Sequence, residues 1–363
     1  MLTDEIAYLD HKVLENFMID VFKGIGVPED DAKICAEVLI TSDLRGITSH
    51  GVQRLKMYYD RVTADIQKPV TEITIVKEAP SSALIDGGHG MGHVAAYKAM
   101  EIAIKKAKET GSAAVAVGNS THYGIAGYYP LMAIKEGMLG MAVTNARPSI
   151  APTFGIEPMM GTNPLTFGLP TDEEFPFVID CATSITQRGK IEVLSRTETP
   201  APEGWVINED GSLATDTVKI LKDLKDGNAA LLPLGGAGET LGGHKGYGYA
   251  ALVEILSAAF SNGPFLKDLT LEKGYKIGHF FFVVDISKII SLDVFKKIAG
   301  DICRSLRNSK KAPGQDRIYT AGEKEFEIEK KIRETGVPLN KSIQNDLLFM
   351  QKELGLTQYE FPF

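Results

Sequence analysis

Cysteine is scarce in this chain, and tryptophan is nearly absent. There are three cysteines and one tryptophan among 363 residues. Cys35, Cys181 and Cys303 lie far apart without a CxxC pair, which excludes a disulfide framework and a zinc knuckle. No run approaches the roughly 18 apolar residues of a membrane span, and the acidic stretch Met1 to Ile6 does not resemble a signal peptide. We therefore expect a protein of a reducing compartment, and a cytoplasmic one.

An excess of positive charge is also missing. Lysine and arginine number 39 against 47 aspartate and glutamate, so the formal net charge is −8. General binding of nucleic acid or of anionic membranes needs concentrated positive charge, so neither is expected. The apolar share of 44% and charged share of 24% are ordinary for a globular protein. The length predicts two domains, or one large domain with an inserted piece.

Several common sequence motifs are absent as well. Gly246, Gly248 and Ala251 form a chance G-x-G-x-x-A, but no strand immediately precedes them and no acidic residue follows at the expected distance, so this is no Rossmann fingerprint. There is no Walker motif and no GxSxG elbow. The stretch from Gly88 to His93 holds two histidines among glycines with no carboxylate nearby, which favours a turn over a metal site. We expect no metal.

The apolar pattern predicts an α/β protein whose two ends are helical. Residues from about 4 to 66 indicate helices, and the chain is helical again after Val284, with a charged amphipathic stretch at 323–357. Between them, short apolar runs alternate with helices at 93–110 and 125–136, which is typical of α/β units. The runs predict strands at 83–85, 113–117, 139–143, 176–180 and 280–284. The polar segment 198–230, which contains Trp205, is predicted to be an irregular surface excursion.

Two polar clusters carry histidines with possible chemistry. The segment 45–54 holds Ser49 and His50 between Arg45 and Arg54, which suits a reaction that moves a proton while an anion is clamped. The alternative for this segment is a helix cap at Ser49 with solvated arginines. The second cluster, 118–127, follows a continuous apolar run and places His122 after a predicted strand. There an imidazole can act as acid or base, or simply cap the turn.

Two further clusters contribute possible anion contacts. Small and hydroxyl residues at 144–148, 161–165 and 180–184 are followed by Arg188 and Lys190, although Asn145, Asn163 and Thr183 could equally be turn residues. The segment 234–248 is the densest glycine tract and opens a helix, with Lys245 close to its start. A glycine-rich helix entry with a lysine suits an anion or a pyrophosphate.

Together these clusters resemble one family. Arg45-Gly46-x-x-Ser49-His50-Gly51-x-x-Arg54, Asn119-Ser120-x-His122-Tyr123-Gly124, Gly161-Thr162-Asn163-Pro164 and Gly243-His244-Lys245-Gly246-Tyr247-Gly248 occur in the order and spacing of the malate/L-lactate/sulfolactate dehydrogenases. That family includes the archaeal-type malate dehydrogenases, ureidoglycolate dehydrogenase and a cyclic-imine reductase branch. The resemblance covers nearly the whole chain.

The resemblance implies an NAD(P)-dependent oxidoreductase, most simply a malate dehydrogenase that uses NAD, with NADP possible. It implies a homodimer and a cofactor domain that is not Rossmann-type, with a mixed sheet. We place that α/β domain at 73–299, and expect 1–72 and 300–363 to pack together as a helical domain. The alternatives are a lactate, sulfolactate or ureidoglycolate dehydrogenase or an imine reductase of the same family, and, in another class, a non-catalytic nucleotide-binding protein.

The resemblance also implies roles for individual residues. His50, assisted by Ser49, and His122 share the catalytic site, with His50 closer to the substrate anion and His122 nearer the nicotinamide; which of them carries the proton stays open. Substrate contacts are expected from Arg54, Arg45, Thr162, Arg188 and Lys190. So many cations favour a dianion such as malate or sulfolactate, although one or two could pair with cofactor phosphate or surface acids. Cofactor contacts are expected from His122, Tyr123, Gly124, Ile125, Ala126, Asn145, Asp180, Cys181, Ala182, His244, Lys245, Pro313, Gly314, Gln315 and Arg317.

Overall fold

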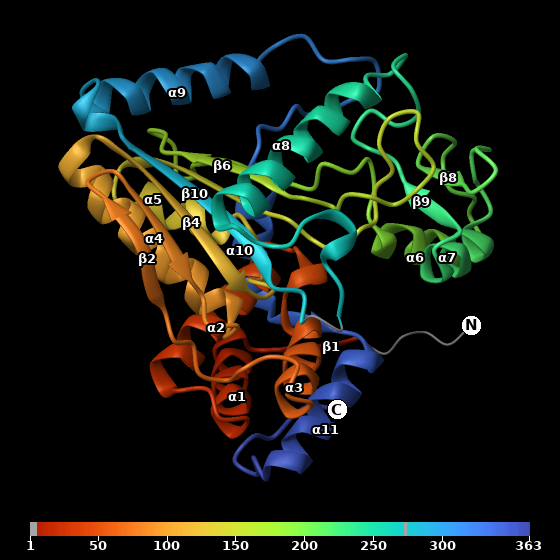
Figure 1. Ribbon diagram of the computed structural model, residues 1–363, viewed down its shortest axis with the longest axis horizontal. Helices are drawn as coiled ribbons and strands as arrows, with labels where there is room; N and C mark the ends of the chain where they lie inside the picture. Colours follow the sequence, from red (N-terminus) through yellow and green to blue (C-terminus); the bar gives the residue numbers. More distant parts are fainter. Residues whose placement is uncertain (1–5, 272–273) are drawn as a thin grey trace.

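The computed structural model describes residues 6–271 and 274–363, and a seven-stranded mixed sheet forms its centre (Figure 1). The strand order is β2-β3-β4-β10-β5-β6-β7. β3 and β4 are parallel, whereas the other neighbours pair antiparallel. The expected α/β class is therefore confirmed. The strands are β2 (Thr74–Ala79), β3 (Ser82–Asp86), β4 (Ser112–Ser120), β5 (Met138–Thr144), β6 (Leu165–Leu169), β7 (Phe177–Cys181) and β10 (Ile277–Asp285).

All five predicted strands are present, while β2 and β6 were not predicted. β2 is an edge strand exposed along its whole length, so it has no apolar face for the sequence to reveal. β6 has the sequence Leu-Thr-Phe-Gly-Leu. Its Thr166 is buried, and burial is tolerated because the hydroxyl donates a hydrogen bond to the carbonyl of Ala142 on β5. A buried threonine and a glycine hide the strand pattern that the pairing nevertheless satisfies.

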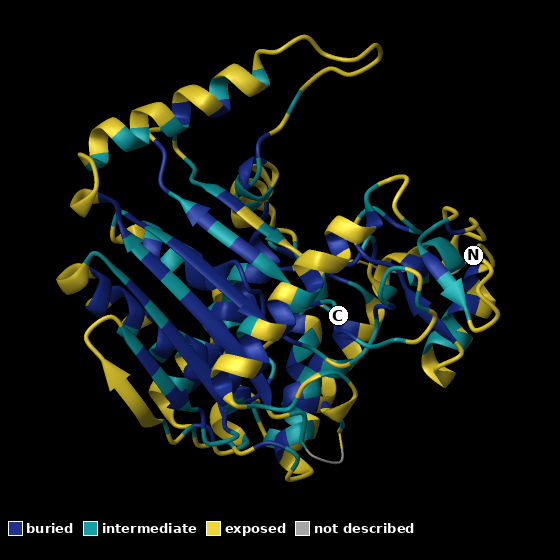
Figure 2. Cartoon of the chain, turned by 45° about the horizontal axis from the view of Figure 1, so that its top comes forward, coloured by how far each residue is buried: buried dark blue, intermediate teal, exposed yellow. Residues whose placement is uncertain are grey.

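Helices cover both faces of the sheet, and β10 shows how the faces divide. Phe281 and Val283 pack in one buried cluster with the alanine-rich face of α4 (Gly92–Thr110) and with α5 (Tyr128–Lys135). Phe280 packs in a second cluster with Val253 of α8 (Gly243–Ser261) on the opposite face. This alternation follows from the two-residue period of a strand. Figure 2 shows the buried sheet between these layers.

The two ends of the chain meet in one helical layer below the sheet (Figure 1). Phe17, Leu39 and Leu55 share a buried cluster with Leu347 and Met350. β1 (Ala7–Leu9) pairs with β11 (Val337–Leu339), so the prediction of helix there is wrong, and residues 4 and 5 lie outside the described residues. None of the helices in the described part of the chain is long and apolar enough to cross a bilayer. The helices are α1 (His11–Gly24), α2 (Glu29–Leu44), α3 (Leu55–Thr63), α10 (Glu323–Thr335) and α11 (Lys341–Leu354).

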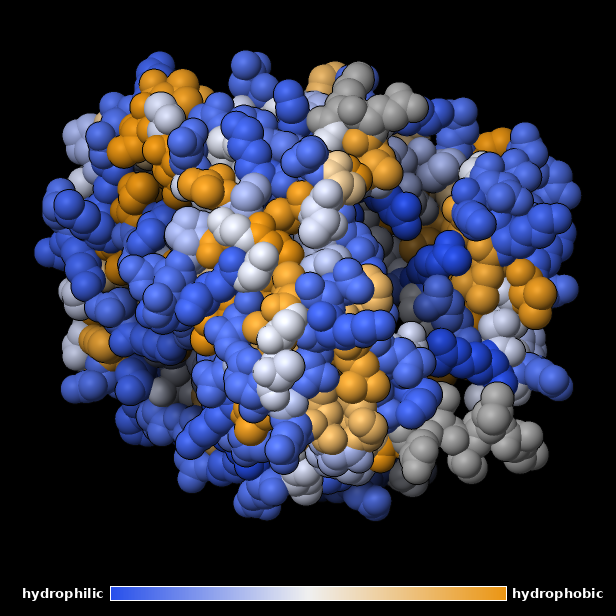
Figure 3. Space-filling model, turned by 90° about the horizontal axis from the view of Figure 1, so that it is seen from below, coloured by the Kyte–Doolittle hydropathy of each residue, from blue (hydrophilic) through white to orange (hydrophobic). Residues whose placement is uncertain are grey.

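The segment predicted as an irregular excursion is instead a small lobe with its own core. Ile191, Val206, Ile220 and Leu231 are buried together. The helix α7 was missed because most of its residues are polar; Asp216 caps it by accepting hydrogen bonds from two backbone N–H groups. Figure 3 shows a hollow between this lobe and the body of the molecule. The elements of the lobe are α6 (Arg188–Arg196), β8 (Val206–Asn208), α7 (Thr217–Asp226) and β9 (Ala229–Leu231).

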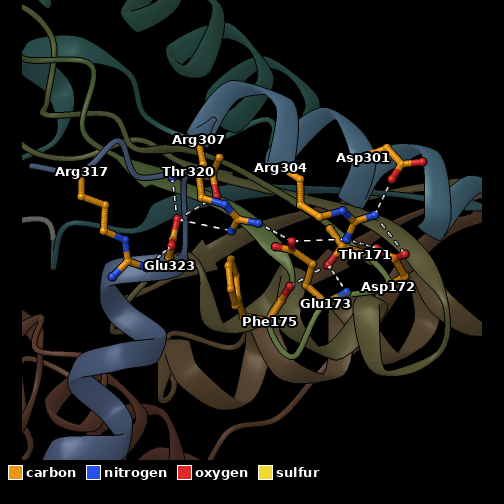
Figure 4. Close-up of polar contacts among 10 residues, drawn as sticks. All are labelled: Thr171, Asp172, Glu173, Phe175, Asp301, Arg304, Arg307, Arg317, Thr320 and Glu323. Carbon is orange, nitrogen blue, oxygen red and sulfur yellow. Dashed lines mark hydrogen bonds and ion pairs between the residues drawn. The ribbon is translucent and has the colours of Figure 1, made fainter. Parts of the chain in front are cut away.

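A helical arm extends away from the body. α9 (Leu292–Arg307) follows the short helix η4 (Ile286–Lys288) and leads into a loop whose residues 308–317 are all exposed. Figure 2 shows this loop standing clear of the molecule. Its base is fixed by an ion-pair network in which Arg307 bonds Glu173 and Arg317 bonds Glu323 (Figure 4).

Candidate active site

The loop between α2 and α3 folds over a buried carboxylate. The backbone N–H of Val52 donates to Asp43 Oδ2 at 2.7 Å. Gly51 lies directly on this carboxylate, since an added Cβ would stand 1.8 Å from Asp43 Oδ1. Burial raises the pKa of Asp43 to about 8. This contact fixes the short helices η1 (Thr48–His50) and η2 (Val52–Arg54), which carry the first predicted cluster.

The structure brings the two predicted histidines together. The rings of His50 and His122 are stacked, with centroids 5.4 Å apart and an interplanar angle of 19°. Ser49 Oγ lies 2.8 Å from His50 Nδ1, so Ser49 contacts the imidazole and makes no cap bond. Burial lowers the pKa of His50 to about 4, with Arg54 adding to the effect. Burial also lowers the pKa of His122, with His50 and Arg54 as further causes. Both imidazoles are therefore neutral at neutral pH.

Guanidinium groups gather near the histidine pair: the charges of Arg54 and Arg61 act on His122, and that of Arg147 acts on Arg61. Arg54 donates from Nε to the carbonyl of Ser49 at 2.7 Å. Arg61 lies two turns further along the chain, on α3, and its pKa is lowered by burial and by the charges of Arg54 and Arg147. Within the described ranges, none of these three arginines has a carboxylate within 4 Å. Three cations without a neutralising acid form a site for an anion, and especially for an anion with two negative groups.

Comparison with known proteins identifies the family. Residues 9–348 match the family described as malate/L-lactate dehydrogenase. The chain belongs to the malate/L-lactate dehydrogenase family. It is 45% identical over 345 residues to a malate dehydrogenase of Pyrococcus horikoshii, covering 94% of each chain. It is 37% identical to an L-sulfolactate dehydrogenase of Methanocaldococcus jannaschii, covering 94% of this chain and 96% of that one. A crystal structure of a malate dehydrogenase from Entamoeba histolytica matches with a TM-score of 0.94 and 40% identity, covering 99% of this chain and 100% of that one.

As a member of this dehydrogenase family, the protein is an oxidoreductase that acts on a CH–OH group. Of the cations near the histidines, the sequence singled out Arg54 but missed Arg61 and Arg147. Arg61 could have been found because it stands seven residues after Arg54, about two turns into the helix that starts directly after Arg54. Arg147 could have been found because it follows the end of β5 inside the third polar cluster.

The other cations expected at the substrate have partners elsewhere. Arg45 is buried and its Nη1 lies 4.0 Å from Glu329 Oε2 of α10. Arg188 bonds Glu192 at 3.0 Å, and Lys190 lies over the ring of Trp205 at 5.3 Å, both within the lobe. The carbonyl of Thr162 accepts hydrogen bonds from the backbone and hydroxyl of Thr183. These contacts do not join the Arg54 cluster.

Two stretches predicted for the cofactor meet at the start of α5. The N–H of Gly127 donates to Asp180 Oδ2 at 2.8 Å, which joins the 122–126 stretch to the end of β7 and to Cys181 and Ala182 beside it. Burial raises the pKa of Asp180. The side chains of Tyr123, Ile125 and Ala126 are buried in the core. Apart from the imidazole of His122, the backbone of this stretch is therefore what remains to contact a cofactor.

The amide of Asn145 is fully used inside the protein. It donates to Glu254 Oε1 and to the carbonyl of Pro264, both at 3.3 Å, and accepts from the N–H of Gly278 at 3.0 Å. Asn163 also donates to Glu254, at 2.8 Å, so this one carboxylate of α8 holds two turns in place. The side chains of both asparagines therefore stabilise turns, which was the alternative to a role in ligand binding.

The glycine tract forms a cradle at the start of α8. Gly242 is left-handed with φ of 88°, and a Cβ on Gly243 would stand 2.0 Å from the carbonyl oxygen of Gly236. His244 and Lys245 lie in the first turn, where helix N–H groups lack partners within the helix. In the segment that precedes α6 in the sequence, the buried hydroxyls of Ser184 and Thr186 have no hydrogen-bond partner among the described residues. Such donors fit the phosphates of a dinucleotide.

The last stretch predicted to contact the cofactor, residues 313–317, lies on the arm and does not contact the other predicted cofactor residues of the same chain. Pro313, Gly314, Gln315 and Arg317 all lie on the exposed loop of the arm. Arg317 pairs with Glu323 at the start of α10 (Figure 4). It also pairs with Glu327, at 2.7 Å. No group of three or more potential metal ligands comes together within residues 6–271 and 274–363.

Proposed function

We propose that the protein is a nicotinamide-dependent malate dehydrogenase that interconverts malate and oxaloacetate. One observation carries the choice of substrate: Arg54 and Arg61 place positive charge near His122, Arg147 adds its charge next to Arg61, and none of the three has a carboxylate partner in the described residues. A dicarboxylate supplies two negative groups and so matches this excess. The identity with relatives named malate dehydrogenase supports the same choice.

The residues of the chain have separate tasks in this reaction. The guanidinium of Arg54, held by the carbonyl of Ser49, is placed to bind the carboxylate next to the reacting carbon. Arg61 and Arg147 are placed to bind the distal carboxylate. A nicotinamide bound there would supply the hydride acceptor or donor. The cradle of Gly242 to Lys245 would hold its phosphates, and we propose that this mixed sheet binds the cofactor without a Rossmann unit.

A substrate panel tests the proposal. Oxaloacetate, pyruvate and sulfopyruvate are offered with NADH and NADPH in parallel, and loss of nicotinamide absorbance is followed. We expect the highest kcat/KM with oxaloacetate and NADH. Turnover of pyruvate at equal or higher efficiency would contradict the dicarboxylate assignment, and turnover with NADPH alone would correct the cofactor.

The variant Arg147→Gln tests the clamp itself. A charge-assisted hydrogen bond contributes about 1.5–3 kcal/mol, so kcat/KM for oxaloacetate should fall by about 10- to 150-fold. The value for pyruvate, which lacks the distal carboxylate, should change by less than about threefold. Arg196→Gln, an exposed arginine of α6, is the matched control. Equal losses for both substrates in the Arg147 variant would place Arg147 outside the distal clamp.

We also propose that two copies associate through α8 and α9. Each helix carries exposed apolar side chains: Leu252, Ile255 and Phe260 on α8, and Ile298, Ile302 and Leu306 on α9. Apolar faces of this extent mark an interface, and in a twofold dimer the apolar face of one copy can cover that of the other. Sedimentation velocity should show a dimer, and Ile302→Asp should shift it towards the monomer. Val218→Asp changes another exposed apolar residue, on the lobe, and should leave the dimer intact.

Two further proposals concern location and domain division. Cys35, Cys181 and Cys303 are all free thiols, which supports a cytoplasmic location. The shared core of residues near 9–62 and 332–350 supports a helical domain built from both chain ends, separate from the α/β domain.

A further inference from the structure

Tyr58 and the backbone of Gly124 both reach the same nitrogen of His122. The hydroxyl of Tyr58 lies 2.5 Å from His122 Nδ1, and the N–H of Gly124 points at that nitrogen from 3.4 Å. A backbone N–H can only donate, so Nδ1 must act as an acceptor and carry no proton. The neutral imidazole of His122 then has its proton on Nε2.

Tyr58 is held firmly in the position that enforces this state. Its side chain is fully buried, and the ring of His93 packs edge-on against it with centroids 4.6 Å apart. Burial raises the pKa of the Tyr58 phenol, so the hydroxyl stays protonated and can donate a hydrogen bond to His122 Nδ1. The groups that face His122 are Tyr58, His50, Arg54, His93 and Arg61, all neutral or positive, and Arg54 also opposes a cation on His50, so what distinguishes the two histidines is the hydrogen bonding at Nδ1.

His50, by contrast, can carry its proton on either ring nitrogen. Its Nδ1 contacts the hydroxyl of Ser49 at 2.8 Å, and a hydroxyl can donate or accept. When Ser49 donates, the proton of His50 is on Nε2; when Ser49 accepts from Nδ1–H, Nε2 is bare and can take a proton. The protonated ring is also accommodated, since Ser49 still accepts from Nδ1–H.

We propose that Tyr58 is a positioning residue that locks His122 as an Nε2–H hydrogen-bond donor to the substrate oxygen, which leaves His50 as the only one of the two that carries the proton. This inference rests on the proposed function. In malate oxidation the O–H bond breaks and its proton moves to His50 Nε2. The C2–H bond breaks as hydride leaves with its electron pair for the nicotinamide, and the C2 oxygen becomes the carbonyl that His122 polarises.

Paired substitutions separate the two roles. A glutamine side chain can place an N–H near the position of Nε2 but cannot carry a proton. We expect His122→Ala to lower kcat about 100- to 1000-fold, the cost of losing such a donor. His122→Gln should recover at least about tenfold of that loss. His50→Ala and His50→Gln should both lose about 100- to 10,000-fold, with no recovery by glutamine. Recovery at position 50 and none at position 122 would overturn the assignment.

The lock has a readout that does not depend on turnover. With ¹⁵N-labelled histidine, the ring-nitrogen signals of His122, identified by their loss in His122→Gln, should report an unprotonated Nδ1 and a protonated Nε2. In Tyr58→Phe these signals should shift towards a mixture of the two tautomers, because the remaining contact from Gly124, at 3.4 Å, is longer than an ordinary hydrogen bond and orients Nδ1 only weakly. That variant should lose no more stability than one buried hydrogen bond accounts for and should keep its NADH affinity, while kcat falls about 2- to 10-fold, the value of one neutral hydrogen bond.

The outcomes of the two arms are distinct. A protonated Nδ1 in the unmodified protein, or an unchanged tautomer in Tyr58→Phe, would overturn the lock whatever the activity. If no 2-oxo acid is turned over while the nitrogen signals follow the expected pattern, the proposed function fails and the positioning role of Tyr58 stands.

Discussion

Replacing Gly51 by alanine should disable the site without touching a reacting group. Gly51 has φ of −90°, so no left-handed backbone is required, although its ψ of −143° lies outside the main regions of residues with a Cβ; the larger obstacle is the space that the new Cβ needs. The new Cβ would stand 1.8 Å from Asp43 Oδ1 and 2.2 Å from its Cγ, against an ordinary contact above 3.4 Å. Either the carboxylate or the loop must therefore move by more than about 1 Å.

The expected loss follows from that displacement. The hydrogen bond between Val52 and Asp43 breaks or stretches, and the histidine and arginine on either side of Gly51 move with the loop. A misplacement of about 1 Å costs roughly 100-fold in rate, and the broken buried bond costs about 1–3 kcal/mol of stability. Initial rates of NADH oxidation with oxaloacetate and urea unfolding followed by circular dichroism measure the two effects.

A matched alanine substitution provides the control for Gly51→Ala. A Cβ added to Gly189 of α6 would meet nothing within 4 Å, so Gly189→Ala should leave rate and stability unchanged. The reasoning would be refuted if Gly51→Ala kept its rate within about threefold of the unmodified protein. A fall in both variants would point to glycine flexibility instead of the Asp43 contact.

Two other substitutions probe buried charge. Burial raises the pKa of Asp43 from 3.8 to about 8, so the protonated side chain contributes stability that is fully present below pH 3.8 and is lost as the pH rises to about 8. Asp43→Asn, which does not titrate, should therefore show a smaller decline in the free energy of unfolding between about pH 4 and 8, and an equal decline would contradict the assignment. Arg307→Met removes a cation shared by Glu173 and Glu323 (Figure 4) and should lower the free energy of unfolding by about 1–3 kcal/mol, whereas Lys310→Met on the exposed loop should not. The pKa of Glu323 is lowered because its hydrogen bonds and the nearby arginines outweigh its burial. The ionised Glu323 therefore stabilises the fold above pH 4.5, and this contribution is lost as the pH falls; the loss should be smaller in Arg307→Met. If urea unfolding of Arg307→Met is unchanged, Arg304 and Arg317 suffice to hold the two glutamates.

The sequence predicted the parts of the site that lie in short motifs. His50 and His122 come from segments with polar residues at element ends, and the fold stacks them. The strands with continuous apolar runs were predicted for the same reason: their signal is local. β6 and α7 were missed because a buried threonine and a mostly polar helix derive their stability from distant partners.

Hydrogen bonds between residues far apart in the chain could not be predicted from the sequence. The amide of Asn145 is satisfied by Glu254, which in the sequence is an ordinary acidic residue inside a helix. The contact of Asp43 with Val52 is likewise invisible without the turn between them. A residue type shows which hydrogen bonds a side chain can make, but the fold decides whether a neighbour inside the protein has already made them.

The place of β10 in the sheet has a consequence for synthesis of the protein. This strand comes from residues 277–285, yet it lies between β4 and β5, which precede it by more than a hundred residues. Until it leaves the ribosome, the nascent chain holds two half-sheets with open edges, the kind of edge that recruits other chains. A product that stops before Ile277 lacks its central strand and should aggregate. Folding must therefore be completed late, after most of the polypeptide has been made.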